Sequence, residues 1–217
     1  MNNLLSIQSE IKLKINKLNF MNYQPNIIAV SKTFSIKDIL PLINHGHIHF
    51  GENKVQEAVE KWTNIKNDFQ HLKLHMIGKL QTNKVKYVVP LFDYIHSVDN
   101  IKLAEKISQE QIKNNKKIKL FIQINIASEN QKTGISADKL ENFYSICTKD
   151  MNLNVIGIMC LPPNDKKSSI YFSKMIQLIK KIKLKETSMG MSNDYLEAIN
   201  YKSTYLRIGT KIFGERN

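Results

Sequence analysis

One segment sets the architecture of the chain: Asn26-Ile27-Ile28-Ala29-Val30-Ser31-Lys32-Thr33. Its apolar, mostly β-branched residues stop abruptly at polar ones, which is typical of a strand buried on both faces of a parallel sheet. Lys32 then lies at the carboxyl end of this strand, where α/β proteins bind ligands. A lysine amine partly withdrawn from water can condense with an aldehyde. With 30 lysines in the chain, however, the segment alone favours an ordinary solvated lysine, so the rest of the sequence must decide.

The same kind of strand recurs seven more times, and nearly every strand is followed by a helical pattern. The further strands are predicted at 47–50, 72–77, 94–97, 119–127, 154–159, 187–189 and 205–208. Helices are predicted between Ser35 and Gly46 and at 54–65, 81–89, 100–114, 136–149, 168–183 and 193–201. This alternation of strands and helices predicts a parallel sheet, and eight repeated strands predict an α/β fold of the closed (β/α)8, TIM-like type.

An additional helix is expected at the N-terminus. Apolar residues recur there with the helical period, at Leu4, Ile7, Ile11, Ile15 and Leu18. No helix-sized segment follows the eighth strand before Asn217, so we expect residues 4–18 to cover the gap that a missing eighth helix would leave. Glycine and proline are sparse and mark no linker, so residues 1–217 are predicted to form a single domain.

The net charge of +13 raises the possibility of nucleic-acid binding. Thirty of the 32 basic residues are lysines, and arginine, which forms the better fork for phosphates and guanine, occurs only twice. The densest basic runs, 113–119 and 180–185, contain no interleaved aromatic residues on which bases could stack. We therefore expect solvated helix ends and no nucleic-acid partner.

The sequence also indicates where the protein acts. No apolar stretch approaches the roughly 20 residues of a membrane helix, and the N-terminus lacks the pattern of a signal peptide. The two cysteines, Cys147 and Cys160, have neither disulfide nor metal-binding spacing. We expect a cytoplasmic protein without membrane association.

Two polar segments near the C-terminus are candidates for binding a phosphate group. In barrels of this type a phosphate is often bound after strands seven and eight. Here Ser192 follows the seventh strand, and Gly209 and Thr210 follow the eighth. Glycine allows close backbone approach to an anion, and exposed N–H groups bind its oxygens. Because strands one and eight are neighbours in a closed barrel, a phosphate here and an aldehyde at Lys32 match the two ends of pyridoxal 5'-phosphate (PLP).

An ordered set of motifs strengthens this interpretation. The chain resembles the pyridoxal phosphate homeostasis proteins, which are single-domain relatives of the barrel half of alanine racemase. The matching residues, in order, are Ala29-Val30-Ser31-Lys32-Thr33, His49-Phe50-Gly51-Glu52-Asn53, Val55-Gln56-Glu57, His75-Met76-Ile77-Gly78-Lys79-Leu80-Gln81-Thr82-Asn83-Lys84, Asn125, Glu129, Lys132, Gly134, Gly157-Ile158-Met159, Ser188-Met189-Gly190-Met191-Ser192, Arg207-Ile208-Gly209-Thr210 and Ile212-Phe213-Gly214.

The resemblance implies a role for each candidate residue. Lys32 would form the internal aldimine, a Schiff base with the cofactor, and Arg207 would face the pyridine nitrogen. A permanent cation beside that nitrogen disfavours its protonation, which makes the ring a weaker electron sink. The resemblance further implies a cofactor pocket lined by Asn53 and a phosphate site formed by Ser192, Gly209 and Thr210.

The implied function is PLP homeostasis, in which the protein buffers or delivers this form of vitamin B6 without strong catalytic activity. The alternative is a PLP-dependent amino-acid racemase. Alanine racemase uses a second base from an additional domain and a partner subunit, and we expect neither in a chain that ends with the barrel. We therefore expect a monomeric PLP carrier, not an enzyme, that makes at most transient contact with PLP enzymes.

Three lysines depart from the pattern of the family. Lys54 replaces a tyrosine, Lys202 a glycine and Lys211 a small residue. Lys202 is expected to alter the turn before the eighth strand, and none of the three replaces an assigned cofactor residue.

Two other groups of polar residues give weaker indications of a site. The alternating His45, His47 and His49 could suggest a metal site, but no third ligand is apparent for a strand face that carries two histidines. Glu129 and Lys132 could form a salt bridge, and no chemistry is assigned to them.

Overall fold

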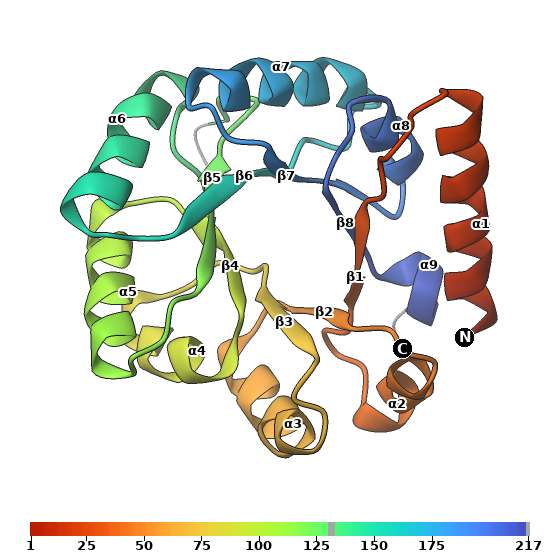
Figure 1. Ribbon diagram of the computed structural model, residues 1–217, viewed down its shortest axis with the longest axis horizontal. Coiled ribbons are helices and arrows are strands. Elements are labelled where there is room, and N and C mark those ends of the chain that lie inside the picture. The colour runs from red at the N-terminus through yellow and green to blue at the C-terminus, as the bar shows by residue number, and fades with distance from the viewer. Residues whose placement is uncertain (130–132, 216–217) are drawn as a thin grey trace.

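The chain forms a closed barrel of eight parallel strands surrounded by helices (Figure 1). The structure is a computed structural model, and it describes residues 1–129 and 133–215. Each strand pairs with the next along the chain, and β8 closes the barrel against β1, with Ile28 opposite Arg207. The strands are β1 (Asn26–Val30), β2 (His49–Glu52), β3 (Lys73–Met76), β4 (Tyr94–Val98), β5 (Lys119–Ile124), β6 (Val155–Cys160), β7 (Glu186–Met191) and β8 (Tyr205–Ile208).

The helices lie on the outside of the barrel, as the alternation of patterns predicted. They are α1 (Asn2–Lys17), α2 (Ile36–Asn44), α3 (Val55–Asp68), α4 (Val85–Leu91), α5 (Ile101–Lys113), α6 (Leu140–Ser145), α7 (Ser168–Lys181), α8 (Tyr195–Asn200) and α9 (Thr210–Phe213). Short 3₁₀ turns, Thr82–Lys84 and Ala137–Lys139, precede α4 and α6, and a π-helical turn, Ile146–Asp150, follows α6. The prediction of a (β/α)8 barrel with an additional N-terminal helix is confirmed.

The N-terminal helix closes one side of the barrel. It buries Leu4, Ile7 and Ile11 and packs against α8 and α9, so that the first and last parts of the chain lie side by side (Figure 1). This is the expected position for a helix that covers the gap after β8. The one-turn helix α9 was not predicted, because four residues are too few to show a helical period.

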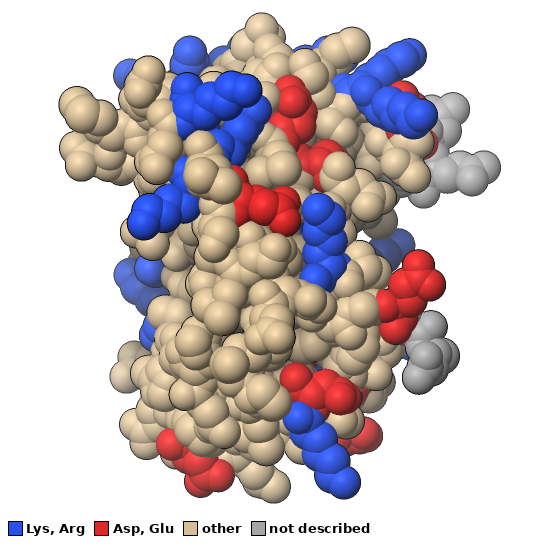
Figure 2. Space-filling model, turned by 90° about the vertical axis from the view of Figure 1, so that its right-hand side faces the viewer, with Lys and Arg blue, Asp and Glu red and all other residues tan. Residues whose placement is uncertain are grey.

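The side of the molecule that carries α1 has a mixed charge. Figure 2 shows lysine and arginine side chains interspersed with aspartate and glutamate and separated by uncharged surface. In the described part of the chain, no helix is both long enough and apolar enough to cross a membrane.

The apolar core lies mainly between the strands and the helices. Outward-facing strand residues such as Leu206 and Ile208 join the buried faces of the helices in one large cluster. A second, small cluster fills the inside of the barrel and consists of Ile28, Tyr94, Phe121, Met159 and Tyr205. Because inward-facing positions alternate with outward-facing ones along each strand, the remaining inward positions are available for polar groups.

The ends of several elements differ from the prediction, and side-chain hydrogen bonds explain two of the differences. Strand β5 ends at Ile124 rather than at residue 127, because Asn125 bonds the backbone of Glu129 through both its amide nitrogen and its oxygen. Helix α8 begins only at Tyr195, because Asp194 Oδ1 accepts the N–H of Met191 and closes a turn first. Strand β2 runs two residues further than expected, through Gly51 and Glu52.

Two local features concern a cap and a turn. A capping box begins α2, since Asp38 Oδ2 accepts hydrogen bonds from Ser35 N at 3.0 Å and from Ser35 Oγ at 2.7 Å. Lys202 adopts φ = +53°, the left-handed conformation that favours glycine. The turn keeps the backbone geometry of a glycine, and the Lys202 ammonium group lies 4.4 Å from the centroid of the Phe20 ring.

Candidate functional site

A cavity of about 820 Å³ opens at the carboxyl ends of the strands. Its size lies within the roughly 300–1,000 Å³ typical of small-molecule sites. The six residues predicted to bind the cofactor all line it, although they come from four separate segments of the chain: Lys32, Asn53, Ser192, Arg207, Gly209 and Thr210. The fold thus brings together every residue that the sequence assigned to one ligand.

The segment that carries Lys32 is anchored by a buried network around Glu52. Ser31 Oγ donates to Glu52 Oε1 at 2.8 Å, and the Ser31 backbone N–H donates to Gly51 O at 3.0 Å. Lys61 Nζ donates both to Ser31 O at 2.9 Å and to Glu52 Oε1 at 3.0 Å. Burial raises the pKa of Glu52, and the charge of Lys61 opposes that rise. The network fixes the backbone from which the Lys32 side chain enters the cavity.

Asn53 follows β2 and lies at the rim of the same cavity. Gly78, after β3, packs directly against it: a Cβ atom added at Gly78 would lie 2.3 Å from Asn53 O. Any larger residue at position 78 would therefore displace the Asn53 backbone. The two residues pack as one unit, which explains why a glycine follows β3 at this point.

The turns after β7 and β8 meet at Ser192. Its Oγ accepts a hydrogen bond from the Gly209 backbone N–H at 3.3 Å. A Cβ atom added at Gly209 would lie 3.3 Å from Val30 Cβ, so glycine lets this backbone lie close to β1. The nearby Asp194 carboxylate accepts from Met191 N–H at 2.6 Å and from Ser168 Oγ at 3.0 Å, so both of its oxygens have partners.

Arg207 lies at the floor of the cavity and is 4% exposed. One terminal nitrogen donates to Ser188 Oγ at 2.6 Å and the other donates to Cys160 O at 2.8 Å. Burial lowers the pKa of the guanidinium group from its usual value, but arginine keeps its charge in proteins. Burial also raises the pKa of the Cys160 thiol to about 12, so this thiol is not a nucleophile at neutral pH.

The lining has a strong excess of positive charge. Its basic side chains are Lys32, Lys79, Lys166 and Arg207, and Asp194 is the single acidic side chain among the described lining residues. Such a set favours an anionic ligand, because opposite charges attract strongly in a partly desolvated cleft. Cations, a glycine whose backbone lies close to β1 and the Ser192 hydroxyl are groups that can hold a phosphate ester, so the residues present fit PLP.

Eight polar lining residues were not singled out from the sequence as site residues: Lys79, Gln123, Thr133, Asn164, Lys166, Ser168, Asn193 and Asp194. Gln123 could have been found, because it is the one amide within the apolar strand segment 120–124. Its Nε2 donates to Thr133 Oγ1 at 2.7 Å, which connects β5 with the segment after the undescribed residues. The lysines carry no local signal in a chain with 30 of them.

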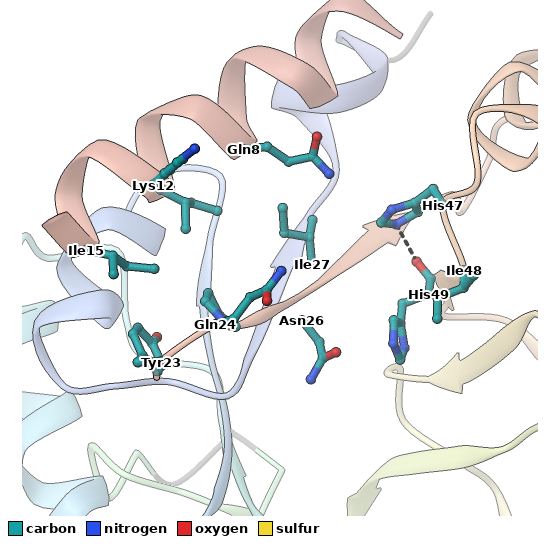
Figure 3. Close-up of a pocket in the computed structure, with 12 residues that line it drawn as sticks. Gln8, Lys12, Ile15, Tyr23, Gln24, Asn26, Ile27, His47, Ile48 and His49 are labelled. Carbon is teal, nitrogen blue, oxygen red and sulfur yellow. Dashed lines mark hydrogen bonds between the residues drawn. The ribbon is translucent and has the colours of Figure 1, made fainter. Parts of the chain in front are cut away.

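The weaker sequence hypotheses can also be placed. Among residues 1–129 and 133–215, no three His, Cys, Asp or Glu side chains are arranged to hold a metal ion. His47 Nε2 bonds to His49 O at 2.9 Å, and both residues line a different cavity, of about 620 Å³ (Figure 3). Lys132 lies outside the described residues, so its proposed pairing with Glu129 stays a prediction.

Comparison with known proteins gives consistent matches over nearly the whole chain. Residues 9–217 match the model of the family described as alanine racemase, N-terminal domain. The chain is 35% identical to the pyridoxal phosphate homeostasis protein of Haemophilus influenzae, over 99% of this chain and 95% of that protein. It is 36% identical to the pyridoxal phosphate homeostasis protein of Aquifex aeolicus, over 88% and 86% respectively.

Solved structures agree with these matches. PipY of Synechococcus elongatus with PLP bound has a TM-score of 0.81 and 29% identity, and the match covers 94% of this chain and all of PipY. Alanine racemase of Corynebacterium glutamicum has a TM-score of 0.63 and 15% identity, and the match covers 96% of this chain and 61% of the racemase. This last similarity concerns the fold alone.

Proposed function

The chain belongs to the family of pyridoxal phosphate homeostasis proteins, whose fold is that of the alanine racemase N-terminal domain, and we propose that it binds PLP and buffers or delivers it. In this proposal Lys32 holds the cofactor covalently through its aldehyde carbon, and Ser192, Gly209 and Thr210 bind the phosphate. Arg207 faces the ring nitrogen, and Asn53 lines the ring site. When bound, the cofactor supplies an electrophilic aldehyde and an electron-withdrawing ring.

One observation carries the proposal: residues from both ends of the chain converge on one cationic cavity at the carboxyl ends of the strands. Since β1 and β8 are hydrogen-bonded neighbours, Lys32 and the Gly209–Thr210 turn border the same cavity although 177 positions separate Lys32 from Gly209 in the sequence. A single small molecule can therefore contact the lysine amine and the phosphate-binding turns at once. The PLP bound in PipY, a protein of closely similar fold, supports the same choice of ligand.

A carrier agrees better with the lining than a racemase does. Racemisation requires two acid–base groups, one on each face of the substrate. Lys32 could serve one face. Apart from Lys32, the described titratable lining side chains are the exposed Lys79 and Lys166, the fully hydrogen-bonded Asp194 and the buried Arg207. None of these is a tyrosine, histidine or cysteine poised to take a proton from a substrate carbon.

We also propose that the carrier is monomeric, acts in the cytoplasm and contacts PLP enzymes transiently. The interspersed charges on the α1 face (Figure 2) agree with a soluble surface there. Sedimentation velocity at micromolar concentration should give a single species of about the chain's mass, 25.1 kDa. A stable dimer would contradict this part of the proposal and leave the cofactor site to be tested separately.

The direct test is to load the protein with PLP, reduce it with borohydride and map the modified peptide. We expect a pyridoxyl group on Lys32. Lys79 and Lys166 are internal controls, because they line the same cavity and meet the same concentration of aldehyde. Labelling spread equally over the three lysines, or confined to the other two, would contradict the assignment of Lys32.

A further inference from the structure

Three histidines form a continuous hydrogen-bonded chain through the inside of the barrel. His49 Nδ1 lies 2.9 Å from His75 Nε2, and His75 Nδ1 lies 2.9 Å from His96 Nε2. His96 Nδ1 in turn lies 2.9 Å from Ser188 Oγ, which accepts the hydrogen bond from Arg207. The chain begins on β2 and crosses the barrel from β4 to β7 before it reaches β8.

The middle of this chain is fully enclosed. His75 and His96 are both 0% exposed. The ring of Tyr94 stacks on His75 with centroids 4.1 Å apart, and the ring of Phe121 stacks on His96 at 4.3 Å. Burial lowers the pKa of both imidazoles well below its usual value, and the charge of Arg207 lowers the pKa of His96 further. Both rings are therefore neutral at neutral pH.

The two ends of the hydrogen-bonded histidine chain lie at cavities on opposite ends of the barrel. Arg207 lines the candidate cofactor pocket. His49 is half-buried and lines the cavity at the amino ends of β1 and β2, where its side chain is shown in Figure 3. Burial lowers the pKa of His49 to about 4, so this ring too is neutral at neutral pH. The histidine chain thus joins the position proposed for the cofactor ring nitrogen to the far end of the barrel.

Arginine sets the direction of every hydrogen bond in the chain, because it can only donate. Ser188 Oγ accepts from Arg207, and its own hydroxyl hydrogen then needs an acceptor. Within the described part of the chain, the only other hydrogen-bond partner of this hydroxyl is His96 Nδ1. Ser188 therefore donates to His96, and an uncharged His96 must carry its hydrogen on Nε2. His96 Nε2–H then donates to His75 Nδ1, so an uncharged His75 also carries its hydrogen on Nε2. His75 Nε2–H in turn donates to His49 Nδ1, which leaves the hydrogen of His49 on Nε2.

We propose that Ser188, His96, His75 and His49 are positioning residues for Arg207, and that the arginine fixes all three imidazoles as Nε2–H tautomers. Each ring then donates through Nε2 and accepts through Nδ1, from the cofactor pocket toward His49. A guanidinium group held by this chain and by Cys160 O has one orientation before any ligand arrives. Such preorganisation lowers the cost of ligand binding.

The tautomers can be tested on the protein without cofactor. We expect the imidazole ¹⁵N spectrum at pH 7.5 to show a protonated Nε2 and an unprotonated Nδ1 for His49, His75 and His96, whereas exposed His45 and His71 should show averaged signals. A protonated Nδ1 at any of the three positions, or a charged ring, would overturn the proposed direction.

Propagation along the chain distinguishes this arrangement from ordinary packing. Ser188→Ala removes both the acceptor for Arg207 and the donor to His96. We expect the His49 ring, two imidazoles away, to lose its pure Nε2–H signature. Ser97→Ala is a matched control, because Ser97 is also a buried serine beside His96 and its hydroxyl has no hydrogen-bond partner among the described residues. An unchanged His49 signal in Ser188→Ala would overturn the coupling.

A third measurement concerns the cofactor, and only this part rests on the proposed function. Ser188→Ala should weaken PLP binding roughly tenfold or more, the loss of about one hydrogen bond to a charged group, and should change the visible absorption of the loaded protein. Ser97→Ala should change neither. Unchanged affinity and absorption in Ser188→Ala would overturn the positioning role. Failure of the unmodified protein to load would instead overturn the proposed function, and the spectra without cofactor would still decide the tautomers.

Discussion

The two cavities at opposite ends of the barrel are similar in size but differ in chemistry. The pocket at the carboxyl ends has a volume of about 820 Å³ and the one at the amino ends about 620 Å³. The first contains four basic side chains. The second contains one lysine, Lys12, with uncharged amides, isoleucines and two imidazoles whose pKa burial lowers to about 4 (Figure 3). The volumes do not distinguish the cavity that binds an anion, whereas the charges of the lining side chains do.

The direction of the strands explains the difference. At the carboxyl ends, each loop leads into a helix and can present backbone N–H groups, as the Gly209 N–H does toward Ser192. At the amino ends, backbone carbonyl oxygens at or just before the strand starts accept hydrogen bonds from side chains: His47 bonds to His49 O, and Asn26 Nδ2 donates to Thr204 O at 3.3 Å. A parallel barrel thus has one end suited to anions and one end rich in acceptors.

Substitution of one lysine at each end of the barrel should give the largest difference in PLP loading. Lys32→Ala should abolish covalent attachment of PLP, because the other described lysines that line the pocket, Lys79 and Lys166, do not extend from β1. Lys12→Ala, at the amino-end cavity, should load fully. Absorption of the loaded protein and borohydride labelling measure both variants. Normal loading of Lys32→Ala, or loss of loading in Lys12→Ala, would reverse the assignment of the two ends.

The phosphate-binding turn offers a smaller and more specific contrast. Ser192→Ala should remove one charge-assisted hydrogen bond and weaken PLP binding by about 1.5–3 kcal/mol, or roughly tenfold or more. Pyridoxal, which lacks the phosphate, should bind worse than PLP to the unmodified protein, and the substitution should narrow that gap. Gln24→Ala, in the amino-end cavity, is the control. Equal losses for PLP and pyridoxal would place the phosphate elsewhere.

The same contrast shows what the sequence could and could not predict. The barrel and its carboxyl-end residues follow from local patterns: buried strands, helical periods, and a lysine, a serine and glycines at strand ends. The histidine chain does not, although His75 and His96 each stand between apolar and other polar residues in their strands. Whether such residues meet depends on the stagger of the strands and on contacts across the barrel, such as that from His96 to Ser188. The periodicity of the sequence carries no information about the stagger of the strands or about contacts across the barrel.

Element boundaries were missed for a related reason. The extent of β5 depends on Asn125, whose side chain bonds the backbone four residues later, and the start of α8 depends on Asp194. These side chains compete with the regular backbone ladder at a single position. The strand or helical pattern around Asn125 and Asp194 does not show where the strand ends or where the helix begins.

Acid should destabilise the protein through the imidazoles of the amino-end cavity. Burial lowers the pKa of His47 to about 4, below the roughly 6.5 of an unfolded chain. The stabilisation is complete above pH 6.5 and is lost as the pH falls toward 4, because the unfolded state binds the proton first. Between pH 7 and pH 5 we expect a loss of about 1–2 kcal/mol from His47.

Urea unfolding at the two pH values measures this loss. His47→Gln can keep the hydrogen bond to His49 O without titrating, so its stability should fall less between pH 7 and pH 5. His45→Gln, at an exposed position, should behave like the unmodified protein. An equal pH dependence in all three proteins would show that His47 is already solvated and would weaken the chemical contrast between the two cavities.

The smallest expected effect is a null result at the carboxyl-end pocket. We expect that the loaded protein neither exchanges the α-hydrogen of L-alanine in deuterated water nor inverts the carbon faster than free PLP does. Lys32 can serve one face of the substrate, but the described lining of the pocket contains no tyrosine, histidine or cysteine to serve the other. Arg207 opposite the ring nitrogen would further weaken the ring as an electron sink. Slow exchange without inversion would leave the lack of a second base as the sole obstacle. Rapid exchange with inversion, lost in Lys79→Ala or Lys166→Ala but not in Lys12→Ala, would identify the missing base and make the protein a racemase.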